Sequence, residues 1–276
     1  MKHDIRIIAL DLDGTLLNSN KELTQRNYDV LAAAAAKGIE IVPTTGRFYD
    51  GMPQVIRDLP FVNYAITING AQVRNVRTGE ILYRAEIPWQ QAVELMKFFD
   101  TLPVVYDCFM DDAAWMTASL KSRINDVTDD PHYRKMLRDL RQDVPELKAF
   151  VTGLGHDVQK SQFFTMDMEL RARMLEELPR MFPGIITTAA LAHNVEINQS
   201  HANKGEALLA LASRLGWGAE NVMSFGDGLN DLTMIEAAGL GVAMGNAFDE
   251  VKACADYIAP DCDHDGVAAA IEKFCL

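Results

Sequence analysis

The chain of 276 residues carries 39 acidic and 26 basic residues, a formal net charge of −13, and 49% hydrophobic residues. A chain of this length can form one large hydrophobic core, or one core with a second compact unit. The acidity argues against a nucleic-acid partner, because such proteins present a basic face. No stretch approaches the ~20 apolar residues that span a bilayer, so we expect no membrane partner.

The cysteines and the N-terminal segment favour a cytoplasmic protein. The four cysteines form no CxxC pair and show no zinc-ligand spacing with histidine, which is typical of reduced thiols. The apolar N-terminal run is interrupted by Arg6 and ends at Asp11, so it is too short for a secretory signal. We therefore expect a soluble cytoplasmic chain, and nothing in the sequence marks an oligomer interface.

Short apolar segments recur along both ends of the chain, and most end in a polar or glycine-rich tip. The segments are 5–10, 39–42, 64–68, 222–225, 241–244 and 257–259. Their length and continuous apolar character are typical of strands that are buried on both faces.

Helical patterns lie between these segments. Thr24 is placed to cap a helix that ends at Gly38, and amphipathic helices are expected over 206–215 and 231–238. Because strand and helix alternate, the sequence predicts an α/β fold with a doubly wound parallel sheet. Ligands bind at the carboxyl ends of the strands in such sheets, so we expect the polar tips to converge on one site.

The alternation is interrupted between about residues 81 and 190, where the sequence is typical of a separate α+β unit. The elements expected there are helices over 88–99 and 168–182 and strands over 104–109 and 158–165. No linker rich in Pro, Gly or Ser separates the parts. We therefore expect a discontinuous core domain of residues 1–82 and 191–276, interrupted by an inserted domain of residues 83–190.

Two carboxylates, Asp11 and Asp13, follow the first expected strand. Like charges raise each other's pKa, so such a pair usually needs a metal ion or a shared proton. One carboxylate can attack phosphorus, while the other protonates the leaving oxygen and later activates water. The alternative is a turn with two solvated aspartates, because the motif is short.

A second acidic motif, Gly226–Asp231, follows another expected strand. The glycines beside Asp227 allow a close approach to an ion, and a few carboxylates with retained waters are what Mg²⁺ favours. The alternative is a helix start capped by Asn230 or Asp231. The two interpretations are compatible if Asp227 binds the metal and Asp231 braces the loop.

Two further motifs could bind an anion. In residues 44–47, the Thr45 hydroxyl and exposed backbone amides can hold a phosphate oxygen. Lys204 precedes an expected helix, where anions already bind favourably, and it would supply the cation that a phosphate site on an acidic chain requires. Taken alone, the alternatives are an ordinary Thr-Gly turn and a surface lysine.

The four motifs DLDGT, TTGR, NKG and GDGLND, in this order, resemble the haloacid dehalogenase superfamily of phosphohydrolases. The insertion between the second and third motifs is similar to the α+β cap of its Cof-type members, many of which hydrolyse sugar phosphates. The resemblance covers the whole chain. It implies a Rossmann-like core with a cap, and a Mg²⁺-dependent phosphatase of small phosphorylated metabolites that works through a phospho-aspartate.

Carried over to this sequence, the resemblance implies a role for each motif residue. Asp11 would be the nucleophile and a Mg²⁺ ligand, and Asp227 would complete the side-chain ligands of the metal. Asp13 would be the general acid/base and would offer its backbone carbonyl to Mg²⁺. Lys204 would offset charge between nucleophile and phosphate. The phosphoryl group would be held by Thr45 and by the backbone amides of Leu12 and Gly46, with Asn230 close to it.

The resemblance also places substrate preference in the inserted cap. The cap residues expected to read the leaving group are Asp111, Asp112, Trp115 and Lys121. One departure from the family pattern also concerns substrate preference. Family members often carry a proline after the Glu-Ile pair that precedes the lysine, whereas Glu196-Ile197 is followed here by residues 198–202 without proline.

Other activities remain open at this point. Superfamily dehalogenases lack an acid at the second position, so Asp13 favours phosphoryl transfer over dehalogenation. A phosphotransferase or phosphomutase would pass the phosphoryl group to a second alcohol instead of water. A regulatory switch would keep a phospho-aspartate to hold one conformation, but the receivers that work in this way are much shorter chains without an inserted cap.

Overall fold

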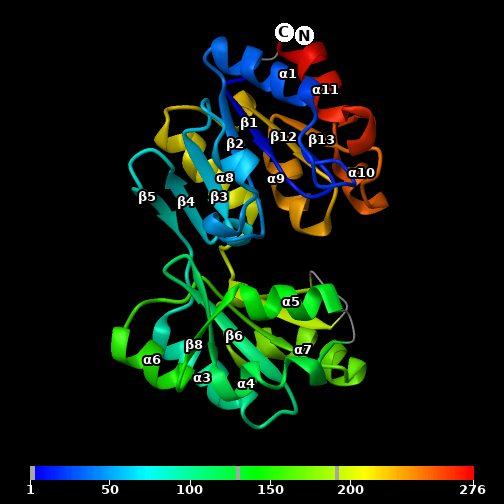
Figure 1. The fold of residues 1–276 in the computed structure, drawn as a ribbon. Coiled ribbons are helices and arrows are strands. Elements are labelled where there is room, and N and C mark those ends of the chain that lie inside the picture. Colours follow the sequence, from blue (N-terminus) through cyan, green and yellow to red (C-terminus); the bar gives the residue numbers. More distant parts are fainter. Residues whose placement is uncertain (1–3, 129–130, 190–192) are drawn as a thin grey trace. The chain divides into compact units, whose positions relative to one another are not determined.

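The structure is a computed structural model that describes residues 4–128, 131–189 and 193–276. The chain forms two units (Figure 1). The core unit runs up to Arg84 and resumes at His201, and the inserted unit is Ala85–Ser200. The domain limits expected from the sequence stay a prediction, and the one between residues 190 and 191 lies outside the described residues.

The core unit is built on a five-stranded parallel sheet with the strand order β14-β13-β12-β1-β2. The strands are β1 (Ile7–Leu10), β2 (Glu40–Pro43), β12 (Val222–Gly226), β13 (Leu240–Ala243) and β14 (Tyr257–Ile258). The central strand β1 pairs with β2 and β12, and Leu10 lies opposite Pro43 and Phe225. The carboxyl ends of β1, β2 and β12 therefore lie at the same edge of the sheet.

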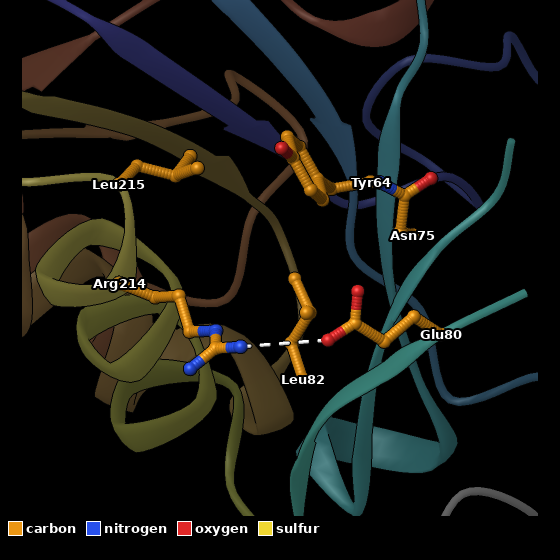
Figure 2. A pocket seen from close by; sticks show the side chains of 6 residues that line it. All are labelled: Tyr64, Asn75, Glu80, Leu82, Arg214 and Leu215. Atoms are coloured by element: carbon orange, nitrogen blue, oxygen red, sulfur yellow. Dashed lines mark hydrogen bonds and ion pairs between the residues drawn. The ribbon is translucent and has the colours of Figure 1, made fainter. Parts of the chain in front are cut away.

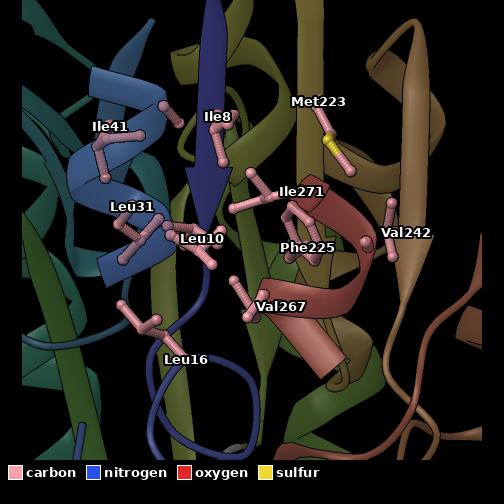
Figure 3. Close-up of a cluster of buried hydrophobic side chains, with 14 of the residues drawn as sticks. Ile8, Leu10, Leu16, Leu31, Ile41, Met223, Phe225, Val242, Val267 and Ile271 are labelled. Carbon is pink, nitrogen blue, oxygen red and sulfur yellow. The ribbon is translucent and has the colours of Figure 1, made fainter. Parts of the chain in front are cut away.

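Side chains of β1 alternate between two hydrophobic clusters, one on each face of the sheet. Ile8 and Leu10 belong to the cluster that includes residues of α1 and α11 (Figure 3). Ile7 and Ala9 belong to the cluster that includes residues of α8. The helices of the core unit are α1 (Gln25–Ala36), α2 (Gln54–Arg57), α8 (Lys204–Arg214), α9 (Leu232–Ala237), α10 (Asp249–Cys254) and α11 (Gly266–Phe274). Helices cover both faces, so the α/β fold with a parallel sheet is confirmed.

The ends of α1 match the sequence pattern. Thr24 is the N-cap, and its Oγ1 accepts a hydrogen bond from the amide of Asn27 at 3.2 Å. Beyond the helix, Gly38 has a φ of +84°, a left-handed conformation that glycine adopts without steric cost. The side chain of the buried Asn27 also accepts from the amide of Ala268 in α11, which fixes α1 beside α11.

The apolar segment 64–68 was expected to add a strand to the parallel sheet, and this expectation is wrong. β3 (Tyr64–Thr67) starts a separate antiparallel sheet with β4 (Gln72–Asn75) and β5 (Ile81–Arg84). The chain reverses directly after β3, so the next segment pairs with β3 itself. Isolated parallel bridges, such as that between Thr44 and Ile66, join β3 to the chain around β2.

The inserted unit is a six-stranded, mainly antiparallel sheet packed with helices, as expected of an α+β unit. The strands, in the order β10-β11-β9-β6-β7-β8, are β10 (Ile185–Thr188), β11 (Asn194–Gln199), β9 (Lys160–Phe164), β6 (Val105–Met110), β7 (Ala113–Thr117) and β8 (Arg141–Val144). The helices are α3 (Trp89–Phe99), α4 (Ala118–Lys121), α5 (Pro131–Asp139), α6 (Leu147–Leu154) and α7 (Met168–Met181). Tyr106, Phe163 and Val195 lie on one face of this sheet, in a cluster with residues of α3, α6 and α7.

Among the described residues, no helix combines the length and the apolar character that a bilayer crossing requires. All four cysteines are free of disulfide bonds.

Candidate active site

Loops of the core unit bring charged side chains together at the carboxyl edge of the parallel sheet. Asp11 directly follows β1, Asp227 directly follows β12, and Lys204 is the first residue of α8. These positions are far apart in the sequence, but their side chains form one cluster with Asp231, which immediately precedes α9.

Lys204 is the cation of this cluster. Its side chain is fully buried, and its Nζ donates to Oδ1 of Asp11 at 2.6 Å and to Oδ1 of Asp231 at 2.5 Å. Burial lowers the pKa of the Lys204 ammonium, but the charges of both aspartates outweigh that effect and hold the pKa well above its ordinary range. Lys204 is therefore a fixed positive charge and not the exposed lysine of the alternative interpretation.

Asp11 experiences opposing influences. Burial raises its pKa, the charge of Lys204 lowers it, and Asp231 and Asp227 raise it, with a net value of about 7. Its backbone is held in the sheet, since its amide donates to the carbonyl of Phe225 at 3.0 Å. At neutral pH the Asp11 carboxyl group is therefore poised between its charged and neutral forms unless further positive charge is present.

Asp227 is held by a hydroxyl group and a glycine. The Thr15 hydroxyl donates to Oδ1 of Asp227 at 2.7 Å. Gly14 has a φ of +91°, and a Cβ atom there would lie 2.5 Å from Oδ2 of the same carboxylate. Burial raises the pKa of Asp227, and the hydrogen bond from Thr15 opposes that shift. The DLDGT motif thus positions Asp227 as well as Asp11.

Asp231 braces the loop after β12. Its Oδ2 accepts from the amides of Asp227 at 2.9 Å and Gly228 at 2.8 Å, while Oδ1 accepts from Lys204. Asp231 is fully buried. These contacts are those of a residue that holds the loop in place, as considered from the sequence. Asp231 also joins the loop to Lys204.

The cluster offers ligands for a metal ion. One carboxylate oxygen from each of Asp11, Asp227 and Asp231 lies within 4.8 Å of the other two. An all-oxygen set with a few carboxylates fits Mg²⁺, which keeps several of its waters. Both oxygens of Asp231 already accept hydrogen bonds, so Asp11 and Asp227 are the side chains better placed to bind the ion.

Asp13 lies in a different environment, with two partners to which the sequence analysis gave no role. Arg47 donates to both carboxylate oxygens, with Nε at 2.8 Å and Nη2 at 3.0 Å, and Nζ of Lys21 lies 3.1 Å from Oδ1. Burial raises the pKa of Asp13, but the hydrogen bonds and charges of Arg47 and Lys21 bring it below its ordinary value. Arg47 is the last residue of the TTGR motif, and this position was the sequence feature that could have identified it as a site residue.

The expected phosphate-holding residues lie around this edge. Thr45 is buried, and its Oγ1 accepts from the amide of Arg47 at 3.2 Å. Asn230 is exposed, and its Nδ2 donates to Oδ1 of Asn69 at 3.1 Å. A Cβ atom at Gly46 would lie 2.8 Å from that same Oδ1, so the loops after β2, β3 and β12 approach closely here.

The side chains proposed to read the leaving group have partners within the inserted unit. These are His156 for Asp111, the carbonyl of Met110 and the ring of Phe150 for Trp115, and Asp143 for Lys121. The backbone amide of Asp112 donates to the side chain of Gln159. None of these contacts tests a substrate role, which stays a prediction.

A cavity of about 400 Å³ lies elsewhere in the core unit, between the β3–β5 sheet and the end of α8 (Figure 2). It is lined by Tyr64, Asn75, Glu80, Leu82, Arg214 and Leu215. Arg214 and Glu80 form an ion pair of 3.4 Å across it. None of the candidate catalytic residues lines this cavity.

Comparison with known proteins identifies relatives over nearly the whole chain. The family model for haloacid dehalogenase-like hydrolases matches residues 8–271. The chain is 32% identical to the 5-amino-6-(5-phospho-D-ribitylamino)uracil phosphatase YcsE of Bacillus subtilis, with 99% of this chain and 97% of the relative covered. It is 30% identical to the pyridoxal phosphate phosphatase YbhA of Escherichia coli, with 96% and 97% covered.

Solved structures show the same fold. A haloacid dehalogenase-like hydrolase from Bacteroides thetaiotaomicron superposes with a TM-score of 0.81 at 29% identity, covering 98% of this chain and 99% of the other. The subclass IIB sugar phosphatase BT4131 superposes with a TM-score of 0.79 at 23% identity, covering 98% of each chain. At that identity the second likeness concerns the fold alone.

Proposed function

Because this chain belongs to the haloacid dehalogenase-like hydrolase family and is a phosphatase, we propose that it hydrolyses small phosphorylated metabolites through a phospho-aspartate on Asp11, with Mg²⁺ as cofactor. The observation that carries the proposal is the cluster that the buried Asp11 and Lys204 form with the half-buried Asp227 at the carboxyl edge of the sheet. In this cluster a carboxylate nucleophile lies beside a fixed cation and a second carboxylate.

The first step transfers the phosphoryl group to the enzyme. A carboxylate oxygen of Asp11 attacks phosphorus, and the bond between phosphorus and the ester oxygen breaks. Asp13 gives its proton to that oxygen, so the products are an alcohol and an aspartyl phosphate. Lys204, at 2.6 Å from Asp11, reduces the repulsion between this carboxylate and the anionic phosphate.

The second step regenerates the enzyme. The Asp13 carboxylate accepts a proton from water as the water oxygen bonds to phosphorus. The bond from phosphorus to Asp11 then breaks, which releases inorganic phosphate and leaves Asp13 protonated for the next cycle. Arg47 and Lys21 stabilise the ionised form of Asp13, so their contacts favour this step and oppose the proton-donating form that the first step needs.

Asp11, Asp227 and the backbone carbonyl of Asp13 would hold Mg²⁺. When bound, the ion offsets the negative charge that develops on the transferring phosphoryl group. The same charge would oppose the rise in the pKa values of both side-chain ligands, which burial causes first and repulsion from Asp231 increases. The residues that we propose to hold the phosphoryl group are Leu12 and Gly46 through their amides, and Thr45, Lys204 and Asn230 through their side chains.

The substrate class is supported by the relatives and the family resemblance. The names of two relatives specify a phosphorylated ribitylaminouracil and pyridoxal phosphate, both small metabolites. The resemblance to Cof-type members makes sugar phosphates the leading class. The expected cytoplasmic location fits such substrates and stays a prediction.

The test is phosphate release from a panel of small esters, which includes sugar phosphates, nucleoside monophosphates and pyridoxal phosphate. We expect release with Mg²⁺ and none in EDTA, because metal-free carboxylates would repel the substrate. Full turnover in EDTA would contradict the proposal. No release from any ester under either condition would contradict it as well.

The same assay with an added alcohol separates hydrolysis from phosphoryl transfer. Hydrolysis predicts that released phosphate equals released alcohol product, even when glycerol or a sugar competes with water. A phosphotransferase would instead yield a new ester and less phosphate. A phospho-aspartate that persists for many minutes would favour the regulatory switch.

A further inference from the structure

The turn that follows β3 has a strained backbone. Ile68 has a φ of +51°, Asn69 of +56° and Gly70 of +96°, so three successive residues are left-handed. This conformation is rare for a β-branched residue and tolerated by asparagine. Such strain persists only where surrounding contacts enforce it. The contacts of this turn therefore indicate which neighbouring segments it holds in place.

Backbone hydrogen bonds join the turn to the TTGR loop. The amide of Asn69 donates to the carbonyl of Thr45 at 3.1 Å, and the amide of Ile68 donates to the carbonyl of Arg47 at 3.0 Å. The two bonds flank Gly46, whose amide we propose to hold the phosphoryl group. The strained turn thus fixes the backbone of that loop.

The turn also lies against the start of α8. A Cβ atom at Gly70 would lie 2.2 Å from the carbonyl oxygen of Asn203, the N-cap that precedes Lys204. Only glycine permits this approach, because both the contact and the φ of +96° exclude a side chain. The turn therefore supports the segment that delivers Lys204 to Asp11.

The Asn69 side chain completes the connection. Its Oδ1 accepts from Nδ2 of Asn230 at 3.1 Å, which links the turn to the loop after β12. The same oxygen would lie 2.8 Å from a Cβ atom at Gly46. One amide group is thus in contact with two loops that hold the phosphoryl group in the proposed mechanism.

We propose that Asn69 is a positioning residue of the phosphate site, which orients the amide of Asn230 and sets its distance from the loop at Thr45 and Gly46. The inference rests on the proposed phosphatase function and deepens it. Asn69 acts through Asn230, so its removal should cost no more than the removal of Asn230 itself. A residue with a merely structural role would instead lower stability without this coupling.

The test is a double-mutant cycle with Asn69→Gly, Asn230→Ala and the double variant. Glycine keeps the left-handed backbone without strain and removes only the side chain, so we expect an unchanged melting temperature. Each single variant should lower kcat/KM for a phosphate ester with Mg²⁺ by roughly 3- to 100-fold, and the double variant should fall little further. Asn125→Gly, at an exposed asparagine of the inserted unit, is the control and should behave as wild type.

Binding of inorganic phosphate with Mg²⁺, measured by calorimetry, gives a second readout. We expect all three variants to bind phosphate more weakly than wild type, Asn69→Gly by no more than Asn230→Ala, and the double variant by about as much as Asn230→Ala. Wild-type rates and phosphate affinity in Asn69→Gly would overturn the inference and leave the phosphatase function intact. Losses that multiply in the double variant would also overturn it. A wild type that neither hydrolyses esters nor binds phosphate would overturn both proposals.

Discussion

Lys204 and Asp11 are 193 positions apart, and yet Nζ of Lys204 lies 2.6 Å from Oδ1 of Asp11 with the lysine side chain wholly buried. A buried ammonium group is costly unless its partners compensate for the lost water. Asp231 is the second partner, at 2.5 Å. Because Asp227 lies nearby, one ammonium group does not balance the three carboxylates, and the site favours a further cation.

Replacement of Lys204 by Met should destabilise the metal-free protein. The change leaves Asp11 and Asp231 buried without their counter-charge, and removal of one partner of a buried pair costs about 3–5 kcal/mol. Urea unfolding in EDTA measures the free energy of unfolding. Lys97→Met, at an exposed lysine paired with Glu94, should cost less than about 1 kcal/mol. Equal effects of the two variants would contradict the account.

The stability of the metal-free protein should depend on pH through Asp11. Its pKa in the folded state is about 7, above the ordinary value of 3.8, so the folded state binds this proton more tightly than the unfolded state. The stabilising contribution is therefore present at low pH and lost as pH rises through about 7. Because of the Asp11 carboxyl group, thermal unfolding in EDTA should show a lower melting temperature at about pH 8 than at about pH 6.

Mg²⁺ should change that dependence. An ion bound to ionised Asp11 stabilises the folded protein more at the higher pH, where no proton competes for the carboxylate. The rise in melting temperature on adding Mg²⁺ should thus be larger at about pH 8 than at about pH 6, and smaller at both in Asp11→Asn. A rise of the same size at both pH values in wild type would count against the metal site.

Gly14→Ala should weaken Mg²⁺ binding and phosphate release, because the new Cβ atom would lie 2.5 Å from Oδ2 of Asp227 and displace that carboxylate. Gly79→Ala is a matched control. Gly79 also has a positive φ, of +77°, but a Cβ atom there would meet nothing within 4 Å. Both variants share the backbone strain, of about 1 kcal/mol. Only Gly14→Ala should lose the Mg²⁺-dependent rise in melting temperature.

The sequence predicted the parts of this molecule that depend on local patterns. Thr24 caps α1 and Gly38 follows its end, as expected from helix-capping chemistry. All the short apolar segments except 64–68 form the parallel strands, and the motif residues at their tips are brought together by the common edge of the sheet. The start of α8 was expected two residues after its position at Lys204.

The remaining features depend on contacts that no local pattern encodes. Arg47 pairs with Asp13 across 34 positions, and no spacing rule joins them. The reversal after β3 depends on a positive φ at Ile68, a residue type that disfavours this conformation. The apolar character of 64–68 therefore indicated a strand correctly but gave no information on its sheet.

Arg47→Ala should move the pH dependence of kcat. Arg47 and Lys21 outweigh burial and lower the pKa of Asp13, so loss of Arg47 should raise that pKa. Because the first step needs protonated Asp13, the alkaline limb of kcat should move to higher pH. Arg26→Ala removes an exposed arginine that pairs with Glu272 and should leave the profile unchanged. An unmoved limb in Arg47→Ala would argue against Asp13 as the acid.

Trapping the intermediate tests the central claim most directly. Wild type and Asp11→Asn are mixed with Mg²⁺ and a hydrolysed ester, quenched in acid within milliseconds, digested and mapped by mass spectrometry. We expect one phosphoryl group on the peptide that contains Asp11 in wild type, none in Asp11→Asn, and a loss of phosphate release on the order of 10⁴-fold in that variant. Phosphate release from Asp11→Asn at the wild-type rate, or a phosphoryl group on another residue, would contradict it.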